Sequence, residues 1–62
     1  NVEKLLSTLP QTQQLAIRLR HFSDMSILQI ADTMEITQEN VRQLLSRARR
    51  TIKDKMEKIY EN

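Results

Sequence analysis

The sequence contains neither glycine nor cysteine among its 62 residues. Without cysteine, no disulfide can stabilise the fold and no thiolate can bind a metal ion. A single histidine, His21, excludes a histidine cluster as a zinc site. One phenylalanine and one tyrosine are the only aromatic residues, and this scarcity, together with the missing glycine, disfavours strands and hairpins. The composition therefore predicts an all-α protein that binds no metal and no cofactor.

Long hydrophobic runs are also missing. No apolar segment approaches the length of about 20 residues that crosses a membrane, and no signal-peptide pattern is present. The sequence shows no nucleophile–base pair and no phosphate-binding loop, which disfavours an enzyme or a small-molecule substrate. A length of 62 residues allows one domain at most, and the chain begins with Asn1. We interpret residues 1–62 as one cytoplasmic domain excised from a longer protein.

Positive charge is concentrated in the second part of the sequence. Residues 1–36 carry three basic and four acidic side chains, a balance of −1, whereas residues 37–62 carry seven and four, a balance of +3. The densest basic run comprises Arg47, Arg49, Arg50, Lys53 and Lys55. A one-sided basic helix suggests an anionic partner such as nucleic acid. Cations also favour the C-terminal end of any solvated helix, so charge alone leaves both interpretations open.

Hydrophobic periodicity predicts four helices, over residues 2–8, 10–22, 27–33 and 38–60. Pro10 ends the first helix and can open the second, because a proline at the first helical position loses no needed N–H group. One face of the second helix is expected to be buried through Leu15, Ala16, Leu19 and Phe22. Ile17 lies opposite this face, so it must either be exposed or contact another element. The predicted core also includes Met25, Met34 and Met56.

Two helix starts and the corner between them have recognisable local signals. Ser26 and Gln29 form an S-x-x-Q capping box, and Thr37 is a favourable N-cap for the last helix. Residues 34–36 form the corner that precedes this helix. A corner this tight usually contains glycine, but here Glu35 stands in its place. We predict that Glu35 adopts a left-handed backbone conformation.

The last helix has two faces when its residues are placed at about 100° intervals. One face is an apolar stripe that we expect to be buried: Val41, Leu44, Leu45, Ala48, Ile52, Met56 and Ile59. The opposite face starts at the N-terminus of the helix and lacks the opposite-charge i,i+4 pairs that are typical of a merely solvated face. It carries arginine, glutamine, glutamate and serine, which can bond base edges or phosphates. This pattern favours a DNA-reading helix over a plain helical bundle.

Three stretches, "LPQTQQLAIRLRHF" (9–22), "MSILQIADTMEIT" (25–37) and "ENVRQLLSRARRTI" (39–52), occur in this order at characteristic separations. Together they resemble region 4 of bacterial RNA polymerase sigma factors, and look most like the extracytoplasmic-function group. That family usually has glycine at the position of Asp24, often glycine at Glu35, and often glutamate at Gln29. The resemblance implies a small four-helix domain with a helix-turn-helix at about 26–50 and a long C-terminal recognition helix.

The same resemblance implies partners. Region 4 binds double-stranded promoter DNA at the −35 element, docks on the β-subunit flap of core RNA polymerase, is a common target of anti-sigma factors, and performs no chemistry. Two alternatives stay open. The chain could be the helix-turn-helix of another transcriptional regulator, or a protein-interaction module that binds only polymerase or an anti-sigma factor.

The polar face and the resemblance together assign expected contacts to individual residues. Base contacts are predicted for Gln38, Glu39, Arg42, Gln43 and Ser46. Phosphate contacts are predicted for Ser26, Arg47, Arg50, Lys53, Arg18 and Arg20. An apolar contact with the polymerase is predicted for Leu5, Leu6, Ile17 and Ile59.

Overall fold

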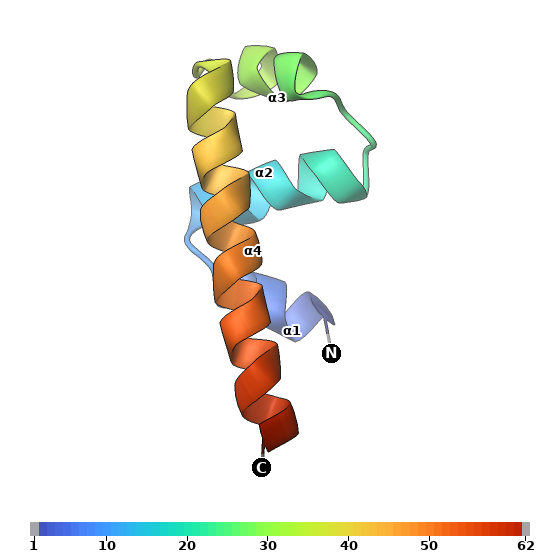
Figure 1. Ribbon diagram of the computed structural model, residues 1–62. Helices are drawn as coiled ribbons and strands as arrows, with labels where there is room; N and C mark the ends of the chain where they lie inside the picture. Colours follow the sequence, from blue (N-terminus) through green and yellow to red (C-terminus); the bar gives the residue numbers. More distant parts are fainter. Residues whose placement is uncertain (1, 62) are drawn as a thin grey trace.

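The computed structural model describes residues 2–61, and the side chains of residues 3–58. It contains the helices α1 (Val2–Ser7), α2 (Gln11–His21), α3 (Ile27–Met34) and α4 (Gln38–Glu61). Helix α4 forms a long rod: α3 lies beside its N-terminal end, α2 crosses its middle, and α1 lies beside its C-terminal half (Figure 1). The predicted all-α, four-helix class is confirmed. Within the described range, no helix has both the length and the apolar character that a membrane span requires.

The apolar stripe of α4 packs against the other three helices. Val41, Leu45 and Ala48 are buried, and Leu44 and Ile52 are half-buried against them. The predicted stripe is therefore confirmed along the part of α4 that α2 and α3 cover. The prediction that Met56 belongs to the core is wrong, because α1 is only six residues long and leaves this side chain 37% exposed. The side chain of Ile59 lies outside the described residues.

Helix α2 buries a different face from the one predicted. Ala16 is buried as expected and Leu19 is half-buried, but Leu15 is exposed and Phe22 is 63% exposed. Ile17, in contrast, is only 4% exposed, so of its two predicted environments the contact with other elements is the correct one.

The physical reason for this shift is that polar side chains share the buried side of α2. Gln13 and Arg20 are half-buried on the same side as Ala16 and Ile17. An arginine can be half-buried in this way when its charged end is bonded, and here its Nη1 donates a 2.8 Å hydrogen bond to the Met25 carbonyl. A pattern that counts only apolar residues therefore misplaces the buried face by about a third of a turn.

The starts of α3 and α4 follow the predicted local signals. The Ser26 hydroxyl accepts a 3.1 Å hydrogen bond from the Gln29 N–H, and the Gln29 side chain accepts a 2.9 Å bond from the Ser26 N–H. The predicted capping box is thus confirmed. Thr37 caps α4, since its Oγ1 accepts a 3.1 Å bond from the Asn40 N–H. These bonds satisfy N–H groups that a helix start otherwise leaves without partners.

The corner between α3 and α4 is a left-handed turn without glycine. Glu35 has φ 59° and ψ 43°, which confirms the predicted left-handed conformation. The Ile36 N–H donates to the Ala31 carbonyl and the Glu35 N–H donates to the Asp32 carbonyl, the bonding pattern of a Schellman helix end. Asp24 also has positive φ, at 55°. Both positions at which the sigma-factor pattern usually or often has glycine thus have the left-handed backbone conformation that favours glycine, although Asp24 and Glu35 occupy them here.

Replacing Glu35 with glycine is expected to stabilise the domain by about 0.5–1 kcal/mol, because glycine enters the left-handed region without a Cβ clash. Thermal unfolding followed by circular dichroism measures this difference. Glu57→Gly is the matched control: Glu57 is exposed within α4, and the same substitution there should cost about 1 kcal/mol. A loss of stability in Glu35→Gly would mean that the glutamate side chain itself holds the corner.

Candidate nucleic-acid interface

The polar face of α4 is exposed from its first residue. Every side chain predicted to contact DNA from this helix is exposed: Gln38, Glu39, Arg42, Gln43, Ser46, Arg47, Arg50 and Lys53. None of these side chains makes a hydrogen bond or an ion pair with another described residue. Helix packing therefore leaves their donors and acceptors available to a ligand. Because α4 is fixed along its opposite stripe, the face is held on a rigid element.

The dimensions of this face fit the major groove of DNA. At 1.5 Å per residue, Gln38 and Ser46 lie about 12 Å apart along the helix axis. The major groove of B-form DNA is also about 12 Å wide. Arg50 and Lys53 lie about 18 and 22 Å from Gln38, beyond the reach of base edges within one groove. The N-terminal part of the face can thus read bases while its later cations meet phosphates.

A mixed groove of about 260 Å³ borders one side of the polar face. It is formed by the start of α2, the corner and α4, and Gln43 and Arg47 of α4 line it together with Thr12 and Asn40. The structure therefore brings Gln43 and Arg47 to the flank nearest α2, whereas Arg42 and Ser46 lie further round the helix. Thr12 and Asn40 are absent from the predicted contacts. Asn40 could have been found from its place in the first turn of α4, but Thr12 has no local signal, since its position depends on how α2 crosses α4.

Ser26 stands at the N-terminus of α3, as the predicted backbone contact requires. Its oxygen already accepts the capping bond, and its hydroxyl proton is free to be donated. Unbonded N–H groups at a helix start attract anions. The position suits a phosphate contact at the start of α3.

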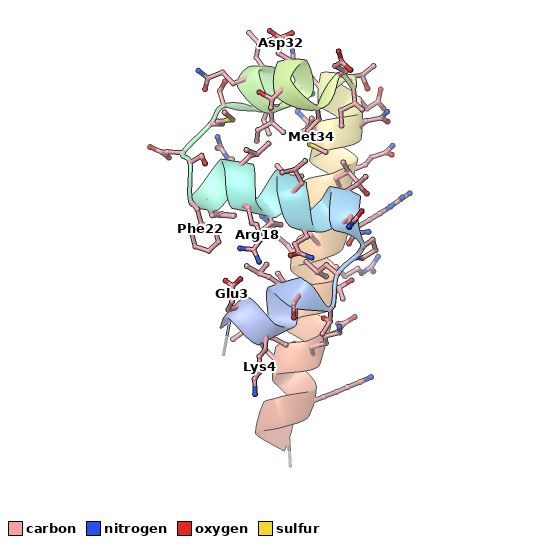
Figure 2. The ribbon with its side chains drawn as sticks, turned by 180° about the vertical axis from the view of Figure 1, so that it is seen from behind. Glu3, Lys4, Arg18, Phe22, Asp32 and Met34 are labelled. Carbon is pink, nitrogen blue, oxygen red and sulfur yellow. The ribbon has the colours of Figure 1, made fainter. Side chains whose placement is uncertain are left out.

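Arg18 and Arg20 do not belong to the exposed polar face. Arg18 faces α1, where its Nη2 donates to Glu3 Oε1 at 2.6 Å and to Gln14 Oε1 at 3.1 Å (Figure 2). Arg20 is bonded to the Met25 carbonyl. Arg18 thus links α2 to α1, and Arg20 links α2 to the loop before α3. Neither is brought together with the cations of α4.

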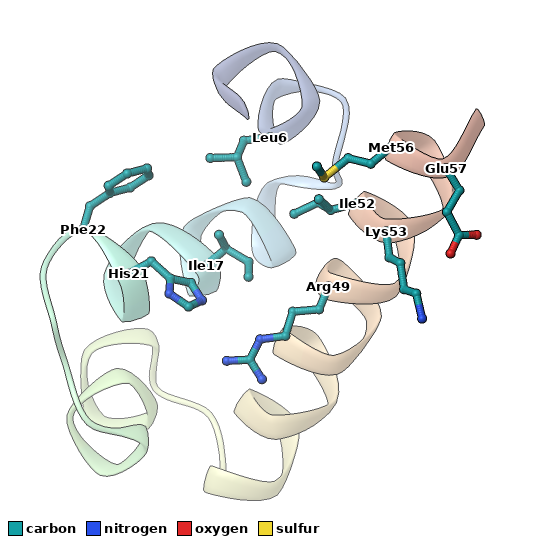
Figure 3. Close-up of a pocket in the computed structure, with 9 residues that line it drawn as sticks. All are labelled: Leu6, Ile17, His21, Phe22, Arg49, Ile52, Lys53, Met56 and Glu57. Atoms are coloured by element: carbon teal, nitrogen blue, oxygen red, sulfur yellow. The ribbon is translucent and has the colours of Figure 1, made fainter. Parts of the chain in front are cut away.

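A second groove, apolar and of about 530 Å³, lies apart from the mixed groove, between α1, the end of α2 and the C-terminal half of α4. Its apolar lining consists of Leu6, Ile17, Phe22, Ile52 and Met56, and its rim consists of His21, Arg49, Lys53 and Glu57 (Figure 3). Among the residues predicted to meet the polymerase, Leu6 and Ile17 line this groove together. Both are buried, so they form its floor, and the exposed apolar side chains are Phe22 and Met56, which were predicted as buried residues and not as polymerase contacts. Leu5 is half-buried and lies outside the lining.

A short helix, a tight left-handed corner and a second helix with an exposed polar face together define a helix-turn-helix DNA-binding domain. Residues 1–52 match the family model described as "Sigma-70, region 4". The chain belongs to this family, whose members are non-enzymatic DNA-binding domains of sigma factors, which act with RNA polymerase in transcription initiation. Searches of the curated proteins and of the solved structures found no match. The predicted relation to sigma-factor region 4 is confirmed.

Proposed function

We propose that this domain binds the promoter −35 element as part of an alternative, extracytoplasmic-function type sigma factor in the bacterial cytoplasm. The observation that carries the proposal is the exposed polar face that begins at the first residue of α4 and has no partners among the described residues. In this arrangement the N-terminus of α4 enters the major groove. Arg42 and Gln43 then suit guanine and adenine, and Glu39 suits the amino group of cytosine.

Phosphate binding completes the proposed complex. Arg47, Arg50 and Lys53 supply positive charge along the flanks of the groove-reading segment, and Ser26 supplies a hydroxyl at the start of α3. Such contacts fix the orientation of a protein on DNA without reading sequence. Thr12 joins this set because it lines the mixed groove together with Arg47.

The second proposed partner is protein. The apolar groove is a large uncovered apolar surface for a domain of this size, and such surfaces mark sites of protein interaction. We assign it to docking on the β-subunit flap of RNA polymerase, with an anti-sigma factor as a competing ligand. The groove lies on a flank of α4 beside the DNA-reading face, so promoter binding and docking engage different side chains apart from Lys53.

A DNA titration at two salt concentrations tests the proposed DNA binding. If Arg47, Arg50 and Lys53 each neutralise one phosphate, log K should fall against log[salt] with a slope of about −2.7. Affinity for promoter DNA should then drop roughly 40-fold between 50 and 200 mM salt. Fluorescence anisotropy with a labelled duplex measures the affinity at each salt concentration. Binding that is absent at low salt, or independent of salt, would contradict the proposal and favour an interaction module without DNA binding.

A further inference from the structure

The two ends of the apolar groove differ in chemistry. Figure 3 shows His21 and Arg49 at the end nearer α3, where the two side chains reach the groove from different helices. Leu6 and Met56 lie at the end nearer α1. Glu57, the one carboxylate among the lining residues, also stands near Met56. Nitrogen donors therefore meet at one end of the groove, and apolar side chains continue from there to the other end.

The floor between the two ends suits hydrocarbon. It is formed by Leu6, Ile17 and Ile52, so it carries no polar side chain. Burying a polar group without a partner is costly, and the buried part of any ligand must therefore be apolar. The groove volume of about 530 Å³ lies within the range of about 300–1,000 Å³ that is typical of small-molecule sites. Such sites combine an apolar lining with a few polar groups that fix the orientation of the ligand.

The positive charge at the rim is not evenly compensated. Arg49 is exposed and makes no hydrogen bond or ion pair with another described residue, so its guanidinium can bond both oxygens of a carboxylate. The exposed ring of His21 adds an N–H donor at the same end. Lys53 stands one turn from Glu57 on α4, and their opposite charges offset each other. The excess charge is therefore at the end formed by Arg49 and His21.

We propose that the groove binds a free long-chain carboxylate of the fatty-acid class, with its head group on Arg49 and His21 and its tail along the floor toward Met56. Charge complementarity supports this occupant, because a cation at one end of an apolar floor matches an anionic head on an apolar tail. The distance from Arg49 to Met56 along α4 is about 10 Å, which an extended tail of about eight carbons spans. A bound ligand would occupy the floor that protein docking requires, so the two would compete.

Octanoate and octyltrimethylammonium test the choice of head group, because they share one tail and carry opposite charges. Each is titrated below its micellar concentration into the 62-residue chain, followed by NMR of the backbone amides. Octanoate should bind at least roughly tenfold more tightly, as expected for hydrogen bonds to a charged group. The largest shifts should fall on the amides of Ile17, Arg49 and Ile52, which locates the ligand in the groove.

Arg49→Glu should weaken octanoate binding at least tenfold and remove the preference for the anionic head. Arg50→Glu is the matched control, since it makes the same change of charge on the next residue, which is exposed but does not line the groove. It should leave the affinity for octanoate within about twofold, which separates head-group contact from the overall charge of the domain. Met56→Asp should weaken octanoate at least tenfold, because it places a charge where the tail ends.

A series of tail lengths tests the fit to the groove. Each methylene buried in the groove should tighten binding about fourfold, so octanoate should bind at least fivefold more tightly than hexanoate. Once the tail passes the end of the groove, further methylenes gain little. Dodecanoate should therefore bind within about threefold of decanoate. A fourfold gain per methylene that continued to dodecanoate would mean adsorption without a defined end and would overturn the proposed site.

Other results would also overturn the inference. Equal binding of the two head groups, or octanoate binding that Arg49→Glu leaves unchanged, would reject recognition of a carboxylate. If octanoate shifted no amide along the groove, the groove would hold no such ligand and would remain a surface for protein docking. Groove amides that shift with protein concentration in the absence of octanoate, and that octanoate does not affect, would show that a second copy of the chain is the occupant.

Discussion

Replacing Ile30 with alanine is expected to unfold most of the domain. Ile30 is 0% exposed and belongs to the buried cluster that joins α3 to Val41 and Leu45 of α4. Truncating a fully buried isoleucine to alanine costs about 2–5 kcal/mol, from lost transfer free energy and from the cavity left behind. The single core of a domain this small rarely supplies more than about 3–5 kcal/mol. Urea unfolding followed by circular dichroism should therefore show a greatly reduced or absent transition.

Leu28→Ala provides the control for this result. Leu28 lies in the same helix but is 60% exposed, so its truncation removes little buried apolar surface. The free energy of unfolding should change by less than about 0.5 kcal/mol. If the two variants lost similar stability, α3 would not pack on α4 through Ile30, and the placement of the helix-turn-helix would be wrong.

The contrast between Ile30 and Leu28 shows what the sequence could predict. In α3 and the first part of α4, the apolar residues other than Leu28 fall on the buried side, and capping residues mark both helix starts, so local signals and packing agree. In α2, the local signals and the packing disagree. The crossing of α2 with α4 buries the side that carries Ala16 and Ile17, and the half-buried Arg20 on this side donates a hydrogen bond to a loop carbonyl. The spacing of apolar residues alone does not predict tertiary packing of this kind.

The residues of the candidate site also differ in how far the sequence could predict their positions. The polar face of α4 could be predicted because all of its members lie on one helix, whose geometry fixes their relative positions. The hydrogen bonds of Arg18 and Arg20 could not be predicted, because Glu3 and the Met25 carbonyl reach them through the packing of α1 and the path of the loop. The apolar groove could be predicted only in part. Leu6 and Ile17 were selected as residues for one contact surface, but the exposed part of that surface is Phe22 and Met56, which periodicity had assigned to the core.

Alanine substitution of Arg42 is expected to change which DNA sequence the domain prefers. Arg42 is exposed on the part of α4 that spans one major groove, and a bidentate arginine–guanine contact contributes about 1–3 kcal/mol of discrimination. Arg42→Ala should therefore weaken binding to the preferred promoter by roughly 5- to 150-fold, with a much smaller effect on unrelated duplex. Selection of bound DNA by the holoenzyme identifies the preferred site, and anisotropy with both duplexes gives the ratio of affinities.

Lys53→Ala separates base reading from phosphate binding on the same helix. Lys53 lies about 16 Å along the axis from Arg42, too far to share its base pairs. Its loss should weaken preferred and unrelated DNA alike and reduce the salt slope by about 1, because one fewer counterion is released. Arg42→Ala also removes one positive charge, so a general charge effect would make the two variants behave alike. Equal weakening of both duplexes by both variants would leave α4 as a phosphate-binding helix and remove the basis for assigning sequence recognition to its N-terminal face.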